Sequence, residues 1–164
     1  MRVPDMKLSC LLLLSTMSLT AHAATCNVSA TPLAFGSYAS PGGVQTDSSS
    51  TLTVSCTPER ILLCTIGYTV SLSAGGAGSY APRKLDSGGN RLDYNLYTSA
   101  TRSTVWGDGT GGTSTVSSSI TSGLLGLLLC DEASKNHTVY ARIPAAQSVP
   151  AGSYADTIVV TVTY

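Results

Sequence analysis

The sequence predicts an all-β fold, a sandwich of two antiparallel sheets, and three observations lead to this prediction. Several segments alternate apolar residues with Ser, Thr or other polar residues at a period of two. Turn-forming stretches such as "SPGG", "SAGGAGS" and "DSGGN" separate them. No amphipathic helix is evident beyond the N-terminal leader. Short strands at this spacing, without helices, are typical of a β-sandwich.

The first 23 residues have the features of an export signal. A basic start precedes an apolar run over Leu8–Leu19, and "AHA" then supplies a small-x-small cleavage site. The run is too short to span a bilayer. Cys10 lies at the beginning of this run, whereas a lipidated cysteine should follow it. We therefore expect a signal peptide over residues 1–23 and one exported domain of ordinary size over residues 24–164.

The charge balance bears on the class of partner. The chain has 9 Lys or Arg and 9 Asp or Glu, for a formal net charge of +0. Nucleic acid or an anionic membrane surface would call for a basic patch, and the sequence offers none. We therefore expect neither as a partner, and no insertion in the membrane.

Four cysteines follow the predicted signal peptide, and an even count in an exported chain predicts two disulfides. Sequence alone permits three pairings. The spacing lacks a C-x-x-C pair and offers a single histidine beyond the leader, so no metal site is predicted. The cysteines are Cys26, Cys56, Cys64 and Cys130.

The phase of the strands favours one pairing. In "TLTVSC" the alternation puts Leu52, Val54 and Cys56 on one face, and Cys26 is in phase with Val28. Both thiols then point inward, and a Cys26–Cys56 bridge would tie the first strand to the second.

The second bridge, Cys64–Cys130, follows mostly by elimination. Both cysteines border leucine-rich stretches, "ILLC" and "LLLC". In the entropic model each closure restricts the unfolded chain by roughly 3–4 kcal/mol.

Three further segments, "TIGYTVSLS", "RLDYNLY" and "HTVYARI", show the same period and predict half-buried strands. Their expected inward residues are Ile66, Tyr68, Val70, Leu72, Leu92, Tyr94, Leu96, Val139, Ala141 and Ile143.

The last segment, "TIVVTVTY", places Ile158, Val160, Val162 and Tyr164 on one face. It contains neither charge nor proline, the usual protection of a strand at the edge of a sheet. Two interpretations follow: an open groove that another chain always covers, or a complete sandwich whose last strand finishes at the terminus. The residues alone do not separate them.

Four blocks, "CNVSATPLAFGSY", "TLTVSC", "YNLYTSATRSTVWGDGTGGT" and "VYARIPAAQSVPAGSYADTIVVTVTY", resemble the spore coat protein U domain family. That family includes subunits of archaic (sigma-class) chaperone–usher pili. The resemblance runs from Cys26 to Tyr164. Its most specific parts are the C-terminal block and the tyrosine–tryptophan block, whose motif residues are Tyr94, Trp106, Gly107 and Gly109.

The resemblance implies an incomplete immunoglobulin-like sandwich that lacks its last strand. It implies a non-enzymatic subunit of an extracellular fimbria that serves adhesion or biofilm formation. A periplasmic chaperone would fill the groove first. At the outer-membrane usher, the N-terminal extension of a neighbouring subunit would replace it by strand addition. The docking edge would be Ile158, Val160, Val162 and Tyr164. A stand-alone adhesin, or a structural protein of a spore or cell coat, remains the alternative.

A subunit that donates a strand needs a free N-terminal segment. The predicted cleavage leaves only residues 24 and 25 before Cys26, and two residues reach about 7 Å. We therefore expect a subunit that accepts a strand without giving one, which places it at the end of a fibre.

An enzyme is the competing class. "GDGTGG" contains G-x-G-x-x-G at Gly107, Gly109 and Gly112, but a dinucleotide site requires a helix to follow, and "TSTVSSSI" is a poor helix start. The sequence favours a glycine-rich turn beside a packed tryptophan.

No catalytic constellation accompanies that loop. His137 has no nucleophile-elbow motif to act with and is expected to face solvent on its strand. Asp131 and Glu132 are adjacent, so they suit a solvated turn better than paired-carboxylate chemistry. Tyr97 and Tyr140 should face outward, and cross-strand packing is favoured over an adhesive patch. We expect no enzyme activity and no cofactor.

Overall fold

The computed structural model describes residues 24–57, 65–121, 124–125 and 129–164. The predicted signal peptide lies outside these residues. So does Cys64, and with it the predicted Cys64–Cys130 bridge.

The described residues form strands and no helix, which confirms the predicted all-β class. None of their elements could therefore span a membrane as a helix. The strands are β1 (Thr25–Ala30), β2 (Thr46–Thr57), β3 (Thr65–Leu72), β4 (Arg83–Ser87), β5 (Asn90–Tyr97), β6 (Val116–Thr121), β7 (Leu124–Leu125), β8 (Leu129–Cys130), β9 (Ala133–Ile143) and β10 (Val160–Thr163).

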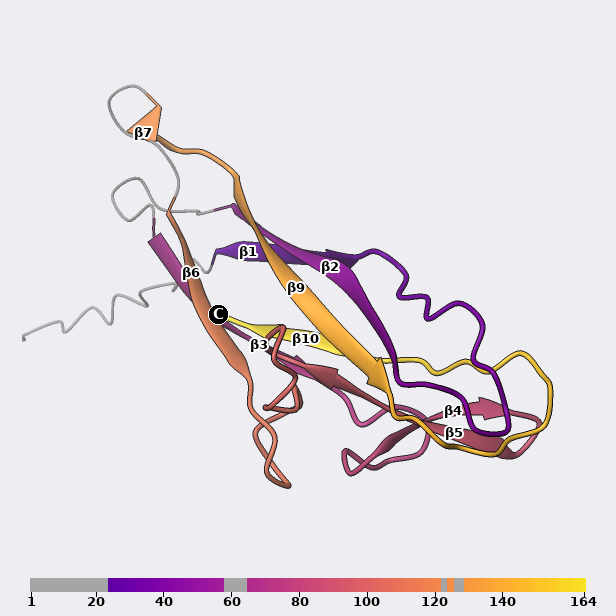
Figure 1. The fold of residues 1–164 in the computed structure, drawn as a ribbon. Helices are drawn as coiled ribbons and strands as arrows, with labels where there is room; N and C mark the ends of the chain where they lie inside the picture. The colour runs from indigo at the N-terminus through magenta and orange to yellow at the C-terminus, as the bar shows by residue number, and fades with distance from the viewer. Residues whose placement is uncertain (1–23, 58–64, 122–123, 126–128) are drawn as a thin grey trace, which may run out of the picture.

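Two antiparallel sheets make up the body of the fold (Figure 1). The larger sheet has the order β1-β2-β9-β5-β4, and the smaller has the order β10-β3-β6. The short β7 and β8 pair with each other. The chain between β1 and β2 and the chain between β9 and β10 both run past the end of the molecule where β4 and β5 lie (Figure 1). β1 and β10 are the outermost strands of their sheets, so one side of the sandwich has two sheet edges facing each other.

The first two strands pair as the cysteine phase predicted. Cys26 lies opposite Cys56 in the β1–β2 register, and the two form a disulfide with a Cα–Cα distance of 4.1 Å. Cys56 is fully buried beside Leu52 and Val54 in the core. The bridge therefore holds the outermost strand of the larger sheet to the hydrophobic interior.

The core is built from the inward residues of the alternating strands. Trp106, in the loop after β5, is the largest side chain in it, and its indole Nε1 donates a hydrogen bond to the Val70 carbonyl at 3.1 Å. The buried apolar residues are Leu52, Val54, Cys56, Tyr68, Val70, Leu72, Leu92, Tyr94, Leu96, Trp106, Ile120, Val139, Ala141 and Ile143.

One buried residue is a cation. Arg83, the first residue of β4, is 0% exposed. Its guanidinium donates to the carbonyls of Ser73 (3.0 and 2.8 Å) and Trp106 (2.7 Å) and to Oδ1 of Asn95 (2.9 Å). A buried charge is tolerated only when such partners satisfy it. Arg83 therefore links three segments through hydrogen bonds: the residue that follows β3, the strand β5, and the loop that contains Trp106.

The prediction that His137 faces solvent is wrong. His137 shares the inward face of β9 with Val139 and Ala141, and it is half-buried. Its Nε2 lies 2.7 Å from the hydroxyl of Tyr68 on the other sheet, and its ring meets that of Trp106 edge-on at 6.4 Å. Burial, with a smaller contribution from the charge on Lys135, lowers the pKa of His137. The period of two along β9 requires this orientation.

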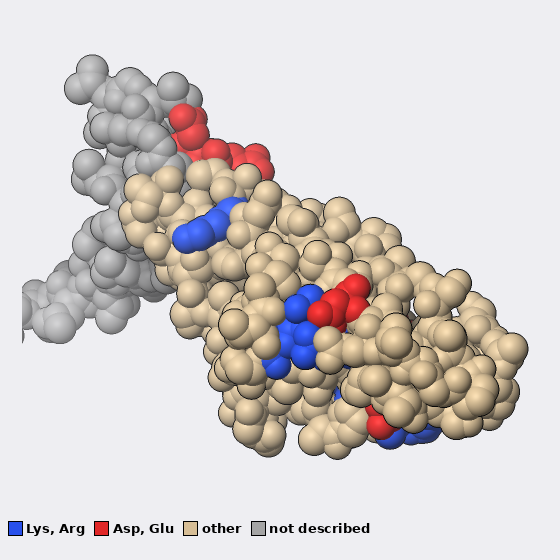
Figure 2. Space-filling view, viewed as in Figure 1, with Lys and Arg blue, Asp and Glu red and all other residues tan. Residues whose placement is uncertain are grey.

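The outward tyrosines pack across the sheet. Tyr97 of β5 lies opposite Tyr140 of β9, and both are half-buried. The Arg102 guanidinium lies over the Tyr140 ring at 5.8 Å. On the face shown in Figure 2, Lys and Arg side chains and Asp and Glu side chains form small groups, and no large patch has charges of one sign.

Candidate functional site

An apolar cleft of about 930 Å³ opens on the side of the sandwich where β1 and β10 face each other. One wall is residues 30–40, the chain that continues from β1. The other wall is residues 149–160, which lead into β10. Core residues such as Leu52, Leu72 and Leu96 line its floor, so the cleft opens onto the hydrophobic interior.

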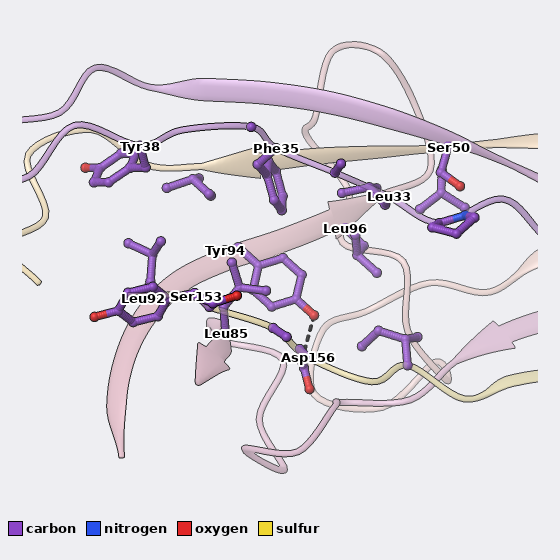
Figure 3. A pocket seen from close by; sticks show the side chains of 18 of the residues that line it. Leu33, Phe35, Tyr38, Ser50, Leu85, Leu92, Tyr94, Leu96, Ser153 and Asp156 are labelled. Carbon is purple, nitrogen blue, oxygen red and sulfur yellow. Dashed lines mark hydrogen bonds between the residues drawn. The ribbon is translucent and has the colours of Figure 1, made fainter. Parts of the chain in front are cut away.

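In the first wall, half-buried and exposed side chains continue to alternate as in a strand, although β1 has already ended. Leu33 and Phe35 are half-buried, whereas Ala34 between them is exposed. Figure 3 shows Leu33 and Phe35 pointing into the cleft, with Tyr94 across from them. The Phe35 and Tyr94 rings meet edge-on with centroids 6.0 Å apart.

Hydrogen bonds hold the two walls together at one end of the cleft. The Ser40 hydroxyl donates to the Val149 carbonyl and accepts from the Val149 amide, both at 2.8 Å. The Tyr38 hydroxyl also bonds to the chain just before the second wall: it donates to the Pro144 carbonyl at 3.1 Å and accepts from the Gln147 amide at 2.9 Å. At the other end the walls lead into β1 and β10, which approach each other.

From Ala155 onward, the main-chain hydrogen bonds that the second wall makes to other described strands go to β4 and β3 on one side. Ala155 exchanges two main-chain hydrogen bonds with Asp86 of β4, at 2.8 and 3.1 Å. Val159 accepts from the Ser73 amide at 2.9 Å, and β10 then pairs with β3. Successive residues of an antiparallel strand direct their main-chain groups to opposite sides. The odd-numbered residues Ala155 and Val159 direct their main-chain groups to β4 and β3. The N–H and C=O groups of the even-numbered residues therefore point toward the cleft. These residues are Asp156, Ile158, Val160 and Val162.

The edge of β1 is open in the same way. The Thr31 amide donates to the Thr51 carbonyl at 2.9 Å, so the odd-numbered residues of β1 bond to β2. Val28 and Ala30 then turn their main-chain groups toward the cleft. No strand pairs with this edge, or with the cleft edge of β10, in the part of the chain that the structure describes. Two unpaired strand edges therefore border an apolar floor.

One carboxylate lies on the second wall. The Tyr94 hydroxyl donates to Oδ2 of Asp156 at 2.7 Å, as the dashed line in Figure 3 shows. The amides of Gly76 and Thr157 donate to Oδ1, both at 2.8 Å. Burial, together with the bond to Asp156 and its charge, raises the pKa of Tyr94. These bonds fix Asp156 to the floor and to the turn after β3.

The sequence matches the Spore Coat Protein U domain over residues 12–161. The chain belongs to this family. The match covers both walls of the cleft and the first two residues of β10.

Two comparisons extend this result. The chain is 32% identical over 126 residues to protein U of Myxococcus xanthus, covering 74% of this chain and 63% of that protein. The structure is also similar to a chain in the crystal structure of the CsuC–CsuE chaperone-tip adhesion subunit pre-assembly complex from archaic chaperone–usher Csu pili of Acinetobacter baumannii. The TM-score is 0.52 and the identity 23%, over 87% of this chain and 40% of that chain. This likeness supports the predicted immunoglobulin-like sandwich.

The residues predicted for the docking edge fall in one row. Ile158 and Val160 line the cleft, and Val162 is half-buried on the same face. Tyr164 continues the row but is 53% exposed.

The family motif supports the core beneath the cleft. Tyr94 lies on the floor and Trp106 is buried beside β3. At Gly107 an added Cβ would lie 2.4 Å from Thr113 Oγ1, so that position requires glycine. Gly109 has a φ of 89°, which favours glycine. The loop leads into the strand β6 and not into a helix, so "GDGTGG" lacks the helix that a dinucleotide site requires.

Sequence reasoning missed the first wall and Asp156. The alternation of Leu33 and Phe35 was visible, but Pro32 and Gly36 interrupt it, and the segment is not a regular strand. Asp156 is in phase with Ile158 and Val160, but a carboxylate next to an apolar row is not a sequence signal for an inward position. No group of His, Cys, Asp and Glu able to hold a metal occurs among the described residues.

Proposed function

We propose that this chain is a non-enzymatic structural subunit of an extracellular chaperone–usher fimbria of the archaic type. In this proposal it is exported through the inner membrane, and another chain completes its fold by inserting a strand into the cleft. Membership of the spore coat protein U domain family and the fold of the Csu complex support the proposal.

The cleft is the observation that carries it. An apolar floor bordered by two unpaired strand edges suits an extended segment that makes main-chain hydrogen bonds to both walls and buries alternate side chains. A long apolar edge without charge is an aggregation hazard in a protein that works alone. From Thr157 onward the C-terminal segment has no charged residue. Covering by another chain removes that hazard.

The partners follow from this role. We propose that a periplasmic chaperone fills the cleft after export, and that a neighbouring subunit replaces the chaperone at the outer-membrane usher. The Csu structure is itself a complex of a chaperone with a pilus subunit. At the cell surface the assembled fibre would serve adhesion and biofilm formation. Placement at the end of the fibre stays a prediction, which N-terminal sequencing of the exported protein tests.

Strand complementation in one chain provides the test. A short Asn-Gly turn and a strand of about nine residues, apolar at every second position, are fused after Tyr164; that length covers the roughly 20 Å from Asp156 to Val162. We expect the fusion to be a monomer with a higher melting temperature, and the chain without it to self-associate. The control fusion carries Ser at the apolar positions.

Equal monomeric stability of the unfused chain and both fusions would contradict the proposal. It would favour a stand-alone adhesin or coat protein instead.

A further inference from the structure

Among the described residues that line the cleft, a single side chain is charged. Of the residues that line it, all are apolar, Gly, Ser, Thr or Tyr except Asp156. Asp156 is half-buried and continues the inward row of Ile158 and Val160. A strand added along this wall would therefore place one of its inward side chains beside a carboxylate.

Asp156 is held in place and cannot easily turn away. Two amides and the Tyr94 hydroxyl donate to it, as described above. The turn after β3 also approaches it closely, because a Cβ on Gly75 would lie 2.1 Å from Oδ2. Gly75 has a φ of 75°, so glycine suits that position on both counts.

No cation of the described residues lies in direct ion-pair contact with this carboxylate. The nearby cation Arg83 is fully buried, and although its charge interacts with that of Asp156, its guanidinium hydrogen bonds go to Ser73, Asn95 and Trp106. Filling the cleft with a wholly apolar strand would remove water from Asp156, which is costly for a charge that has no direct ion pair.

We propose that the strand accepted by this cleft carries Lys or Arg at the one inward position beside Asp156 and apolar residues at the others. This inference rests on the proposed function. A charge-assisted hydrogen bond to Oδ2 would offset the lost hydration. A strand shifted by two residues would instead put its cation against Ile158 and leave the carboxylate uncompensated, so Asp156 selects the register as well as the partner.

The experiment uses a set of apolar strand peptides of about nine residues, each with Lys or Met at one inward position. The full exported chain is refolded with each labelled peptide, and affinity is measured by fluorescence anisotropy. We expect Lys to bind roughly tenfold more tightly than Met at one position, as a buried charge-assisted bond would give, and more weakly at every other position.

Two variants identify the group responsible. In Asp156→Asn the preference for Lys should disappear, while the all-apolar peptide should bind at least as well as before. Tyr94→Phe removes one donor to Asp156 and leaves its charge, so it should keep the preference. This second variant also shows whether altered packing alone changes the result.

The outcomes separate the two proposals. If the all-apolar peptide binds but Lys weakens binding at every position, the inference about Asp156 is overturned and the proposed function stands. If the preference survives in Asp156→Asn, another group is responsible and the inference is again overturned. If no peptide binds to the wild-type chain, the proposed function fails, and this inference fails with it.

Discussion

Replacing Val160 by Lys should abolish the uptake of a strand by the cleft. Val160 lies opposite Leu72 in the β10–β3 register, and both side chains line the cleft. An inserted strand would cover the new ammonium group. Among the described lining residues the one carboxylate is Asp156, four residues away along the row, which is about 13 Å on an extended strand and beyond ion-pair reach.

The magnitude follows from burying a charge without a partner, which costs about 3–5 kcal/mol. The affinity for the all-apolar strand peptide should therefore fall by at least about a hundredfold. Refolding with the labelled peptide and anisotropy measures this change.

The neighbouring residue provides a matched control. Val159 is 60% exposed on the opposite face of the same segment, so Val159→Lys should change the affinity by no more than about twofold, as surface substitutions usually do. Val160→Met lengthens the side chain without adding charge and separates steric effects from electrostatic ones. Equal weakening by Val160→Lys and Val159→Lys would refute the assignment of the cleft face.

Three predictions concern stability, each measured by urea unfolding. Replacing both Cys26 and Cys56 by Ser should lower the free energy of unfolding by about 3–4 kcal/mol, because the bridge closes a sequence separation of 30 residues; an unchanged urea midpoint would contradict this. Arg83→Met should cost about 3–5 kcal/mol by leaving buried acceptors unpaired, whereas Arg91→Met, at an exposed ion pair of 3.9 Å, should cost under about 1 kcal/mol; similar losses would contradict the buried network. Because the pKa of His137 is lowered in the folded state, its contribution to stability is present above its unfolded pKa of about 6.5 and is lost as the pH falls through the folded pKa. His137→Gln should therefore remove part of the loss in stability between about pH 7 and 5, and an identical pH profile would count against it.

The strands with regular alternation could be predicted from the sequence, whereas β4 and β6 could not. The alternation of Val160 and Val162 with Thr residues predicts β10. β4 turns the charged Arg83 inward, which no hydrophobic pattern signals, and β6 contains Ser117, Ser118 and Ser119 in succession. In both strands tertiary contacts outweigh the local pattern.

The sequence predicts a groove beside the last strand through the family resemblance, but it does not predict the first wall of the cleft. That wall depends on how Leu33 and Phe35 pack against Tyr94, a contact between segments far apart in the chain.

The solvent-facing prediction for His137 set it in phase with Tyr140, whereas the period of β9 puts it in phase with Val139 and Ala141. The structure satisfies it through a hydrogen bond to Tyr68. The hydrophobic period of one strand does not reveal which distant polar group will form a hydrogen bond with a residue of that strand.

Amide hydrogen exchange along the last strand tests most directly whether a second chain completes this fold. The amides of Thr161 and Thr163 face β3 and should be protected in the free protein, whereas those of Ile158, Val160 and Val162 should exchange fast. When the all-apolar strand peptide is bound, these three even-numbered amides should become protected. Protection of all five amides in the free monomer, or no gain of protection with the peptide, would contradict the account.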